Sequence, residues 1–430
     1  MKVLVIGSGA REHALVLGLC ADPSVEAVIA APGNPGIAAI AHCEPLPDLT
    51  DAPSAVAIAA RHRVDLVVVG PEAPLVAGVG DALRAAGYAV YGPDAAAARL
   101  EGSKAFAKDV MATAGVPTAL AHVCTTRAEI ESALDALGAP HVVKDDGLAA
   151  GKGVVVTTDR AAALAHGLAC LDKPDGQVVI EEYLDGPEVS VFCLCDGTEV
   201  RALAPAQDFK RVADGDEGPN TGGMGAYSPL PWASPRLAQD IIDTVAQPVI
   251  DEMHRRGTPF VGTLYVGLAM TSRGPRVVEF NCRFGDPDGQ ASLARLVTPL
   301  GTLLYAAATG RLAEFDDLHH RPEAVVVVVE AASGYPKAPR VGDPIDGVDE
   351  VESVEGAHVL HAGTRLDDEG LLVSAGGRVL NVVARGADLA EARDTAYRAL
   401  ELVHLPGGHH RSDIALAASR GEITVEGRTG

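Results

Sequence analysis

The sequence predicts a multidomain α/β and α+β protein that begins with a parallel-sheet domain and ends with a small α+β domain. The chain has 430 residues, and at roughly 150 residues per domain this length suggests about three domains. Its first hundred residues alternate continuous apolar runs with helix-length segments, which is typical of a parallel sheet covered on both faces. From Ala324 the sequence changes to "AVVVVVEAASGYP", followed by short strand-like segments and a helical segment near 388–403, which indicates a small α+β domain.

Four strands are expected in the N-terminal domain. They are "KVLVIG", "VEAVIAAPG", "VDLVVVGPE" and "YAVYGP", and a helical stretch from Arg11 to Cys20 follows the first. Ligands of such sheets bind beyond the carboxyl ends of the strands. Those ends carry the glycine-rich segments 7–9, 32–36 and 70–72, so the crevice of this domain is expected there.

A nicotinamide dinucleotide site is disfavoured in this domain. Glu12 stands where the third glycine of the dinucleotide fingerprint belongs, and the second strand ends without an acidic residue to hold a ribose. The first loop can still receive a phosphate at the helix N-terminus, assisted by Arg11.

The middle of the chain contains a helix, a glycine-rich hairpin and a long loop. Residues 101–120 indicate one helix stopped by Pro117, and "GQVVIEEYLDGPEVSVFCLCDG" indicates two strands. The segment Gly215 to Pro231 is rich in glycine and proline, so we expect no regular structure there and favour a functional loop.

The hairpin "HVVKDDGLAAGKGVVV" at 141–156 is not a Walker loop. Gly147 and Gly151 enclose three residues instead of four, and Lys152 is followed by glycine instead of serine or threonine. The β-branched runs on either side predict strand, flexible loop and strand. Such a hairpin either folds over the phosphates of a nucleotide or is an ordinary hairpin with solvated lysines.

The charge balance disfavours nucleic acid and anionic membranes as partners. The chain has 35 basic and 58 acidic side chains, a net charge of -23, and only 4% aromatic residues for base stacking. Seven scattered cysteines without a C-x-x-C pair indicate reduced thiols in a cytoplasmic protein. The N-terminal apolar run is too short for a signal peptide, and no run is long enough for a membrane span, so we expect a soluble chain.

The segment "RVVEFNCRFGDPDGQ" suggests a metal and anion site. Val277 to Phe280 reads as a strand, so Glu279 and Asn281 lie on one face. A carboxylate and an amide oxygen are suitable hard ligands for Mg²⁺. Arg283 can clamp a carboxylate or phosphate through its fork of donors. The alternative is a structural ion pair between Glu279 and Arg283, but the following R-F-G-D-P favours the site.

Eight segments together resemble the phosphoribosylamine–glycine ligase family of the ATP-grasp superfamily, over nearly all of the chain. They are "VLVIGSGAREHAL", "VGPEAPLV", "GPDAAAARLEGSKAFAK", "DGLAAGKGV", "VIEEYLDGPEVS", "GPNTGGMGAYSP", "VEFNCRFGDP" and "LHAGT". The resemblance implies an N-terminal domain at 1–102, an ATP-grasp core at 103–323 with a mobile lid near 121–189, and a closing domain at 324–430. It also implies a ligase of purine biosynthesis that joins glycine to 5-phosphoribosylamine with ATP and Mg²⁺ or Mn²⁺.

The resemblance implies roles for residues of an ATP site. Lys104 and Lys144 contact phosphates, and Gly151 and Gly153 let the lid close. The remaining residues implied are the adenine hinge Glu181, Glu182, Tyr183 and Leu184, the ribose ligand Glu188, and the metal ligands Glu279 and Asn281.

The substrate side of the site is also drawn from the resemblance. The residues expected to bind glycine and phosphoribosylamine are Gly9, Glu72, Asp208, Lys210, Asn220, Arg283 and Asp286. Lys144, Arg283 and Asp286 are expected to take part in catalysis. The small substrates are the only partners expected, and the acidic surface is compatible with a monomer.

This chain departs from the family pattern at three places. Asp145 follows Lys144 where many relatives have alanine, Phe209 replaces a histidine, and Asp288-Gly289 replaces Glu-Thr. Asp145 either weakens ATP binding or faces away from Lys144, and a role for Asp288 is doubtful. Two rival interpretations are disfavoured. The "GPNTGGMGAY" loop argues against an ATP-grasp ligase or carboxylase with another acid and amine, and the lid and metal-site residues argue against an ATP-binding regulatory protein without activity.

Overall fold

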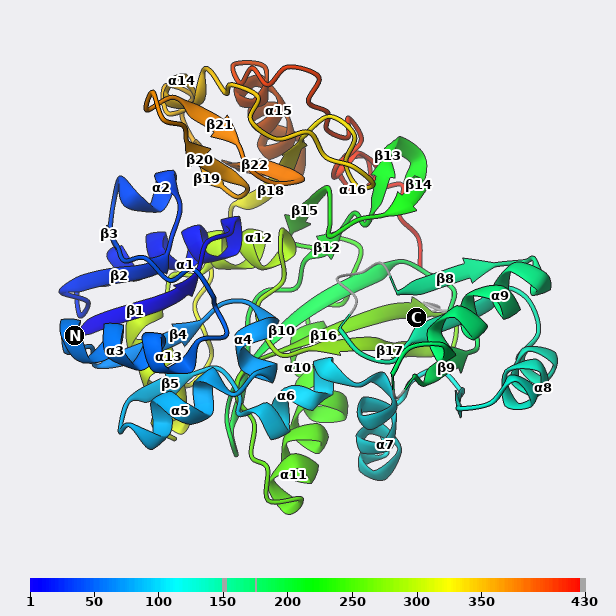
Figure 1. The fold of residues 1–430 in the computed structure, drawn as a ribbon. Coiled ribbons are helices and arrows are strands. Elements are labelled where there is room, and N and C mark those ends of the chain that lie inside the picture. The colour runs from blue at the N-terminus through cyan, green and yellow to red at the C-terminus, as the bar shows by residue number, and fades with distance from the viewer. Residues whose placement is uncertain (149–152, 175, 426–430) are drawn as a thin grey trace.

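The computed structural model describes residues 1–148, 153–174 and 176–425. Four larger sheets surround the centre of the molecule (Figure 1). The N-terminal sheet lies on one side of a central antiparallel sheet, a smaller sheet with two helices lies on the opposite side, and the C-terminal sheet lies above.

The N-terminal sheet is fully parallel, with strand order β3-β2-β1-β4-β5. Its strands are β1 (Lys2–Gly7), β2 (Ala27–Pro32), β3 (His42–Cys43), β4 (Leu66–Val69) and β5 (Ala89–Tyr91). The associated helices are α1 (Ala10–Cys20), α2 (Pro35–Ala38), α3 (Ala52–His62), α4 (Glu72–Val76) and α5 (Val79–Ala85). The four predicted strands and the predicted helix are present, and the short edge strand β3 was not predicted.

Two sheets and four helices form the middle of the molecule. The smaller sheet has the order β6-β9-β7-β8, and the central sheet has the order β11-β10-β16-β17. The strands are β6 (Ala121–Cys124), β7 (His141–Asp145), β8 (Val154–Thr157), β9 (Val178–Glu181), β10 (Glu188–Asp196), β11 (Val200–Ala202), β16 (Val261–Thr271) and β17 (Gly274–Asn281). The helices are α6 (Ala95–Gly102), α7 (Lys104–Ala114), α8 (Arg127–Leu137) and α9 (Arg160–Leu171).

The single helix predicted for residues 101–120 is wrong. Ser103 interrupts it with extended backbone at φ -146°, and its hydroxyl accepts a hydrogen bond from the Phe106 amide at the start of α7. Serine is a strong N-cap because its side chain satisfies an amide that has no partner inside the helix. The chain therefore has two helices, and the second begins with Lys104.

The C-terminal sheet takes strands from two distant parts of the chain, with order β12-β15-β18-β22-β19. Two hairpins, β13/β14 and β20/β21, stand beside it. The strands are β12 (Gln207–Asp208), β13 (Arg211–Ala213), β14 (Glu217–Asn220), β15 (Gly225–Ser228), β18 (Ala324–Ala331), β19 (Ala357–His361), β20 (Thr364–Leu366), β21 (Leu372–Ser374) and β22 (Arg378–Gly386). The remaining helical segments are η1 (Asp214–Asp216), α10 (Leu237–Ile241), η2 (Ile242–Ala246), α11 (Gln247–Arg255), α12 (Asp288–Arg295), α13 (Leu300–Ala308), η3 (Leu312–Glu314), α14 (Val348–Val351), α15 (Leu389–Leu400) and α16 (Leu416–Ser419).

The expectation that Gly215 to Pro231 lacks regular structure is wrong, because β14 and β15 lie inside it. β15 pairs antiparallel with β18, with Gly225 opposite Val328. A Cβ atom at Gly225 would lie 2.7 Å from the Val327 carbonyl oxygen and from Ile414, so only glycine fits this pairing. Pairing with a distant strand thus overrides the weak strand propensity of the segment. Within the part of the chain that the structure describes, no helix is long and apolar enough to cross a membrane.

Candidate active site

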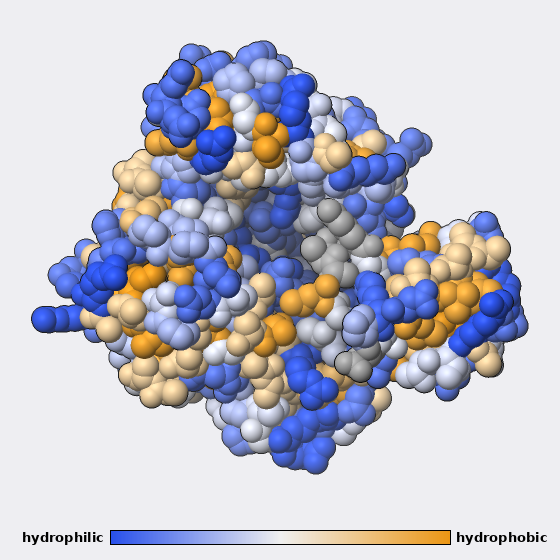
Figure 2. Space-filling model, in the orientation of Figure 1, coloured by the Kyte–Doolittle hydropathy of each residue, from blue (hydrophilic) through white to orange (hydrophobic). Residues whose placement is uncertain are grey.

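A cleft of ≈ 1080 Å³ opens where the sheets meet. Figure 2 shows it as a hollow with hydrophilic residues near the middle of the molecule, beneath the C-terminal sheet. The sequence-predicted site residues that line it are Glu72, Lys104, Lys144, Gly153, Glu181, Glu182, Tyr183, Leu184, Glu188, Asp208, Lys210, Asn220, Glu279, Asn281, Arg283 and Asp286. Gly9 is not among the lining residues, and Gly151 falls outside the described residues.

Three charged side chains join the smaller sheet, which contains the hairpin β7/β8, to helix α7 at the cleft wall. Glu181 on β9 is buried, and its two oxygens lie 3.0 Å from Lys108 Nζ and 2.8 Å from Lys144 Nζ. Lys144 also donates to the Val278 carbonyl at 3.0 Å. Burial lowers the pKa of Lys108, and the Glu181 carboxylate opposes that shift. The carboxylate therefore holds two cations at the cleft wall; Lys108 was not selected, although it ends the segment "GPDAAAARLEGSKAFAK".

Lys104 extends this positive wall toward the hairpin loop. It donates to the Gly147 carbonyl at 2.9 Å, and burial lowers its pKa, with the nearby Lys144 cation acting in the same direction. The neighbouring Asp146 accepts hydrogen bonds of 3.0 Å from the Ser103 hydroxyl and the Ala105 amide. The first strand of the hairpin is thereby attached to the N-terminus of α7.

The predicted adenine hinge follows β9 directly, but its acidic side chains already have partners. Glu182 accepts from the Leu120 amide at 3.0 Å and from Arg273 at 3.1 Å. Tyr183 is 50% exposed. The backbone groups of this segment and the side chains of Tyr183 and Leu184 therefore remain for a ligand. Glu188, the predicted ribose ligand, lies 2.5 Å from Lys210.

Glu279 and Asn281 lie side by side on β17 at the cleft. Burial acts to raise the pKa of Glu279, but Lys210, Lys144, Lys104 and Arg283 outweigh it and lower the pKa. Lys210 is its nearest cation, at 3.7 Å. The predicted strand and its face are confirmed, whereas the alternative ion pair of Glu279 with Arg283 is not the pairing that forms.

Arg283 instead bridges two other glutamates. Its guanidinium lies 3.2 Å from Glu72 on α4 and 3.0 Å from Glu101 on α6. Burial acts to lower the pKa of Arg283, but these two carboxylates raise it well above its usual range. Glu101 also accepts from the Cys282 amide at 2.7 Å, so it fixes the segment that follows β17. Glu101 was not predicted, although it lies in the segment "GPDAAAARLEGSKAFAK" that carries the family resemblance.

Two buried carboxylates meet deeper in the cleft. Burial and then the charge of Asp288 raise the pKa of Asp208 well above its usual range, and Asp208 Oδ1 has no hydrogen-bond partner among the described residues. Burial likewise raises the pKa of Asp288, which accepts a hydrogen bond of 2.5 Å from Ser190. Burial and the repulsion between the two carboxylates therefore disfavour the ionisation of both at once.

Asp286 is held by side chains that sequence reasoning did not select. Gln290 donates to it at 2.7 Å, and Arg378 on β22 lies 3.1 Å away. Asn381, also on β22, donates to Gln290 Oε1 at 2.6 Å. Arg378 comes from a strand 92 residues further along the chain, and no local pattern could have revealed it.

The phosphate site expected at the start of α1 is not supported. The Glu12 carboxylate accepts from the Gly9 amide at 2.7 Å and thus occupies the helix N-terminus. Arg11 is turned toward Glu12, 2.6 Å away, and toward the Phe284 carbonyl. A Cβ atom at Gly9 would lie 4.0 Å from Asp286, so Gly9 stands close behind the cleft wall.

The structure shows the contacts of Asp145 and Phe209, two residues at which this chain departs from the family pattern. Asp145 contacts Lys173 at 2.5 Å, whereas the adjacent Lys144 turns to the cleft, which supports the interpretation that Asp145 faces away. The Phe209 ring packs 6.1 Å from that of Tyr227 and lies under the Arg411 guanidinium at 4.9 Å. Asp288, whose role was doubted from the sequence, lines the cleft, and its charge helps to raise the pKa of Asp208.

Comparison with known families finds one family along the chain. The N domain of phosphoribosylglycinamide synthetase matches residues 1–101, its ATP-grasp (A) domain matches 102–289, and its C domain matches 325–417. A phosphoribosylamine–glycine ligase of Streptomyces coelicolor is 62% identical over 421 residues, which are 97% of this chain and 100% of that protein.

Solved structures agree with this assignment. A crystal structure of phosphoribosylamine–glycine ligase from Thermotoga maritima superposes with a TM-score of 0.83 at 31% identity, over 96% of this chain and 100% of that one. The biotin carboxylase domain of a Hydrogenobacter thermophilus 2-oxoglutarate carboxylase has a TM-score of 0.72 at 16% identity, over 95% and 91% of the two chains. This second likeness concerns the fold alone.

Proposed function

The chain belongs to the phosphoribosylglycinamide synthetase family, and we propose on that basis that it is an ATP-dependent ligase that joins glycine to 5-phosphoribosylamine. The products are glycinamide ribonucleotide, ADP and phosphate, an early step of purine biosynthesis. The observation that carries the proposal is that one cleft is lined by lysines, a hinge segment, oxygen ligands and buried carboxylates from distant parts of the chain.

ATP binds between the smaller sheet, which contains the hairpin β7/β8, and the central sheet. Lys104 and Lys144 neutralise its phosphates, and Gly151 and Gly153 belong to the hairpin that covers them. The segment Glu181 to Leu184 binds adenine through backbone groups, since its carboxylates already hold Lys108, Lys144 and Arg273. Glu188 exchanges its partner Lys210 for the ribose hydroxyls when nucleotide enters.

Glu279 and Asn281 are the residues that hold Mg²⁺ or Mn²⁺. Their chemistry fits, because an ionised carboxylate and an amide on one strand face offer hard oxygen ligands. When its nitrogen donates to the Phe280 carbonyl and to Glu101, at 3.1 and 3.2 Å, the Asn281 amide is held in place. The cation supplies charge neutralisation for the phosphate oxygens.

The substrates occupy the end of the cleft nearest the N-terminal and C-terminal sheets. Arg283 binds an anionic group, and the two glutamates beside it keep it charged and oriented. Asp208 or Asp286 binds an amine. Gly9, Glu72, Lys210 and Asn220 complete the substrate residues.

The mechanism follows from the groups present. A carboxylate is a poor electrophile, so the γ-phosphoryl group of ATP is first transferred to the carboxylate of glycine, which gives glycyl phosphate. The amine of phosphoribosylamine then attacks the acyl carbon, and phosphate leaves. Lys144, Arg283 and Asp286 act by positioning and by charge stabilisation, which are the main sources of rate in such transfers. No covalent nucleophile is assigned, and Cys282 is buried with its sulfur toward the Ala97 and Ala98 carbonyls.

We further propose a cytoplasmic monomer with small-molecule partners, no nucleic-acid or membrane partner, and domains at 1–102, 103–323 and 324–430 with a lid near 121–189. Reduced thiols support the location: all seven cysteines lie in the described residues and are free. Gel filtration with light scattering tests the monomer.

The activity is tested by measuring ADP release with Mg²⁺, adding glycine and freshly made phosphoribosylamine separately and together. We expect ADP release only with both substrates, and a product with the mass of glycinamide ribonucleotide. Turnover with another acid or amine would instead identify a different ATP-grasp ligase or carboxylase. ATP binding without any turnover would favour the regulatory alternative.

A further inference from the structure

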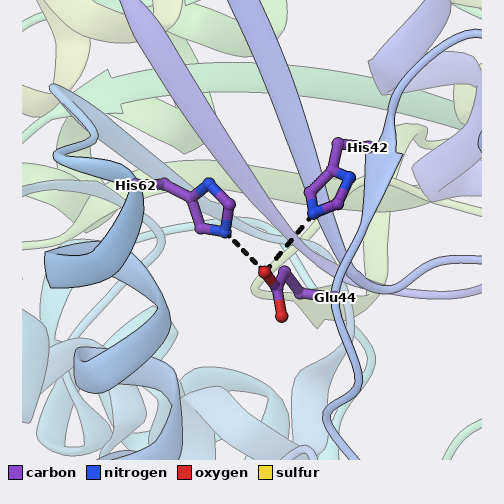
Figure 3. A group of neighbouring side chains, drawn as sticks. All are labelled: His42, Glu44 and His62. Carbon is purple, nitrogen blue, oxygen red and sulfur yellow. Dashed lines mark hydrogen bonds and ion pairs between the residues drawn. The ribbon is translucent and has the colours of Figure 1, made fainter.

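A cluster of two histidines and a glutamate lies on the N-terminal sheet domain, and none of the three lines the cleft. His42 is on the edge strand β3, Glu44 follows that strand, and His62 is the last residue of α3. Figure 3 shows both imidazole rings directed at the same carboxylate. His42 Nε2 lies 3.3 Å and His62 Nε2 lies 2.7 Å from Glu44 Oε1.

The backbone holds these three residues in place. His42 and Glu44 are two apart in extended chain, so their side chains lie on one face. β3 pairs with β2, and the Glu44 amide continues this pairing with a 2.9 Å hydrogen bond to the Ala30 carbonyl. The sulfur of the intervening Cys43 packs toward Gly33 instead. The cluster therefore joins the sheet edge to a helix end.

The donor set suits a transition-metal dication better than Mg²⁺. Zn²⁺ binds imidazole nitrogen and carboxylate oxygen, whereas Mg²⁺ prefers oxygen alone. One donor atom from each residue lies within 4.8 Å of the other two. Tetrahedral Zn²⁺ with bonds of about 2.1 Å places its ligands roughly 3.4 Å apart. The distance of 3.3 Å from His42 Nε2 to Glu44 Oε1 already matches this spacing. The distance of 2.7 Å from His62 Nε2 to Glu44 Oε1 must increase by roughly 0.7 Å.

The surroundings leave room for a fourth ligand and fix the carboxylate. The His42 side chain is 61% exposed, so water can complete a tetrahedral site. Arg61 Nη1 lies 2.9 Å from Glu44 Oε2. The positive charge of Arg61 opposes a bound cation. Its hydrogen bond, however, occupies Glu44 Oε2 and leaves Glu44 Oε1 as the single donor to a metal. Such outer partners orient metal-binding carboxylates.

We propose that His42, Glu44 and His62 form a Zn²⁺ site that is separate from the catalytic cleft and fastens the edge strand β3 to α3. This Zn²⁺ site is independent of the ligase reaction and of the Mg²⁺ or Mn²⁺ that the reaction uses. Because its test measures binding and melting temperature, failure of this proposal leaves the proposed function untouched.

The test is a calorimetric titration of Zn²⁺ into the full-length protein with excess Mg²⁺ and no nucleotide. Mg²⁺ occupies sites built from oxygen ligands but does not compete for imidazole. The variants are His42→Ala, His62→Ala and Glu44→Gln. The matched controls are His122→Ala, an exposed histidine on β6, and Cys20→Ser, which removes the exposed thiol.

We expect one equivalent of Zn²⁺ that survives both controls and is weakened by about tenfold or more in each cluster variant, a loss at least as large as that from removing outer metal-site partners. Zn²⁺ should raise the Tm of the wild type and the controls, and not that of His62→Ala. Unchanged ATP binding verifies that each variant is folded. Equal Zn²⁺ affinity in all proteins, or no Zn²⁺ binding by the wild type, would overturn the proposal and leave a hydrogen-bonded ion-pair cluster.

Discussion

Arg378 on β22 ties the C-terminal sheet to Asp286 at the wall of the cleft. Its Nη2 lies 3.1 Å from the Asp286 carboxylate, while Nη1 donates to the carbonyls of Asp286 and Gly222 at 2.5 and 2.8 Å. The two carbonyls belong to the segment after β17 and to the loop before β15. One guanidinium thus holds together three parts of the chain that converge on the cleft.

Replacing Arg378 should impair substrate positioning. Hydrogen bonds to a charged group contribute on the order of 1.5–3 kcal/mol, so we expect Arg378→Ala to lower kcat/KM for glycine by about tenfold to a hundredfold. Arg378→Lys should recover only part of the lost kcat/KM, because an ammonium group cannot reproduce the fork of N–H donors of a guanidinium. Arg365→Ala, at an exposed arginine of the same region, is the control. Equal kinetics for the Arg378 and Arg365 variants would refute the role.

The adjacent residues Lys144 and Asp145 should differ sharply in function. Lys144→Met removes a buried cation from the cleft, and we expect a loss of about 10²–10³-fold in kcat/KM for ATP, as for other charge-stabilising groups. Asp145→Ala breaks a contact with the mostly exposed Lys173, and neither residue of this pair lines the cleft. The KM of the Asp145→Ala variant for ATP should therefore change by less than about twofold. Lys173→Ala is the matched control, and steady-state kinetics with ATP varied distinguishes the cases.

Asp208 should make glycine binding depend on pH. Its pKa is raised by burial and by Asp288, so the fraction of ionised carboxylate grows as pH rises through that raised value. An ionised carboxylate binds an ammonium group best, so kcat/KM for glycine should rise with pH. Asp208→Asn should lower kcat/KM and flatten its profile. The ratio of wild type to variant at each pH cancels the ionisation of glycine itself, and a ratio that is independent of pH would contradict the role.

Buried histidines between α1 and β19 should make stability sensitive to acid. Burial lowers the pKa of His13 from 6.5 to about 3 and those of His358 and His361 to about 4, and the His361 amide donates to His13 Nδ1 at 2.9 Å. The unfolded chain binds protons at these groups below about pH 6.5 while the folded chain does not. Stability is therefore fully present above that pH and is lost as pH falls toward 4.

The size of this effect is measurable by denaturant unfolding. One such histidine is expected to contribute on the order of 2 kcal/mol of destabilisation at about pH 5. His361→Asn should reduce the slope of the free energy of unfolding against pH, and the exposed control His122→Asn should leave it unchanged. An unaltered slope in His361→Asn would show that the cluster does not carry the effect.

Much of the molecule was predictable where a signal is local. The alternation of apolar runs gave four of the five N-terminal strands, and the β-branched runs around 141–156 gave the hairpin β7/β8. Period two along β17 put Glu279 and Asn281 at the same cleft. Two local predictions were wrong, because Ser103 caps a new helix and because β15 gains its strand from pairing with β18.

The sequence by itself determined the family, the main strands and a set of site residues most of which line the cleft, because motifs and periodicity act over a few neighbouring residues. Only the tertiary structure decided that Arg283 pairs with Glu72 and Glu101 instead of Glu279, that Arg378 reaches Asp286, and that Glu182 is already engaged. The physical reason is that a charged side chain takes whichever partner the packing of distant segments brings within about 3 Å.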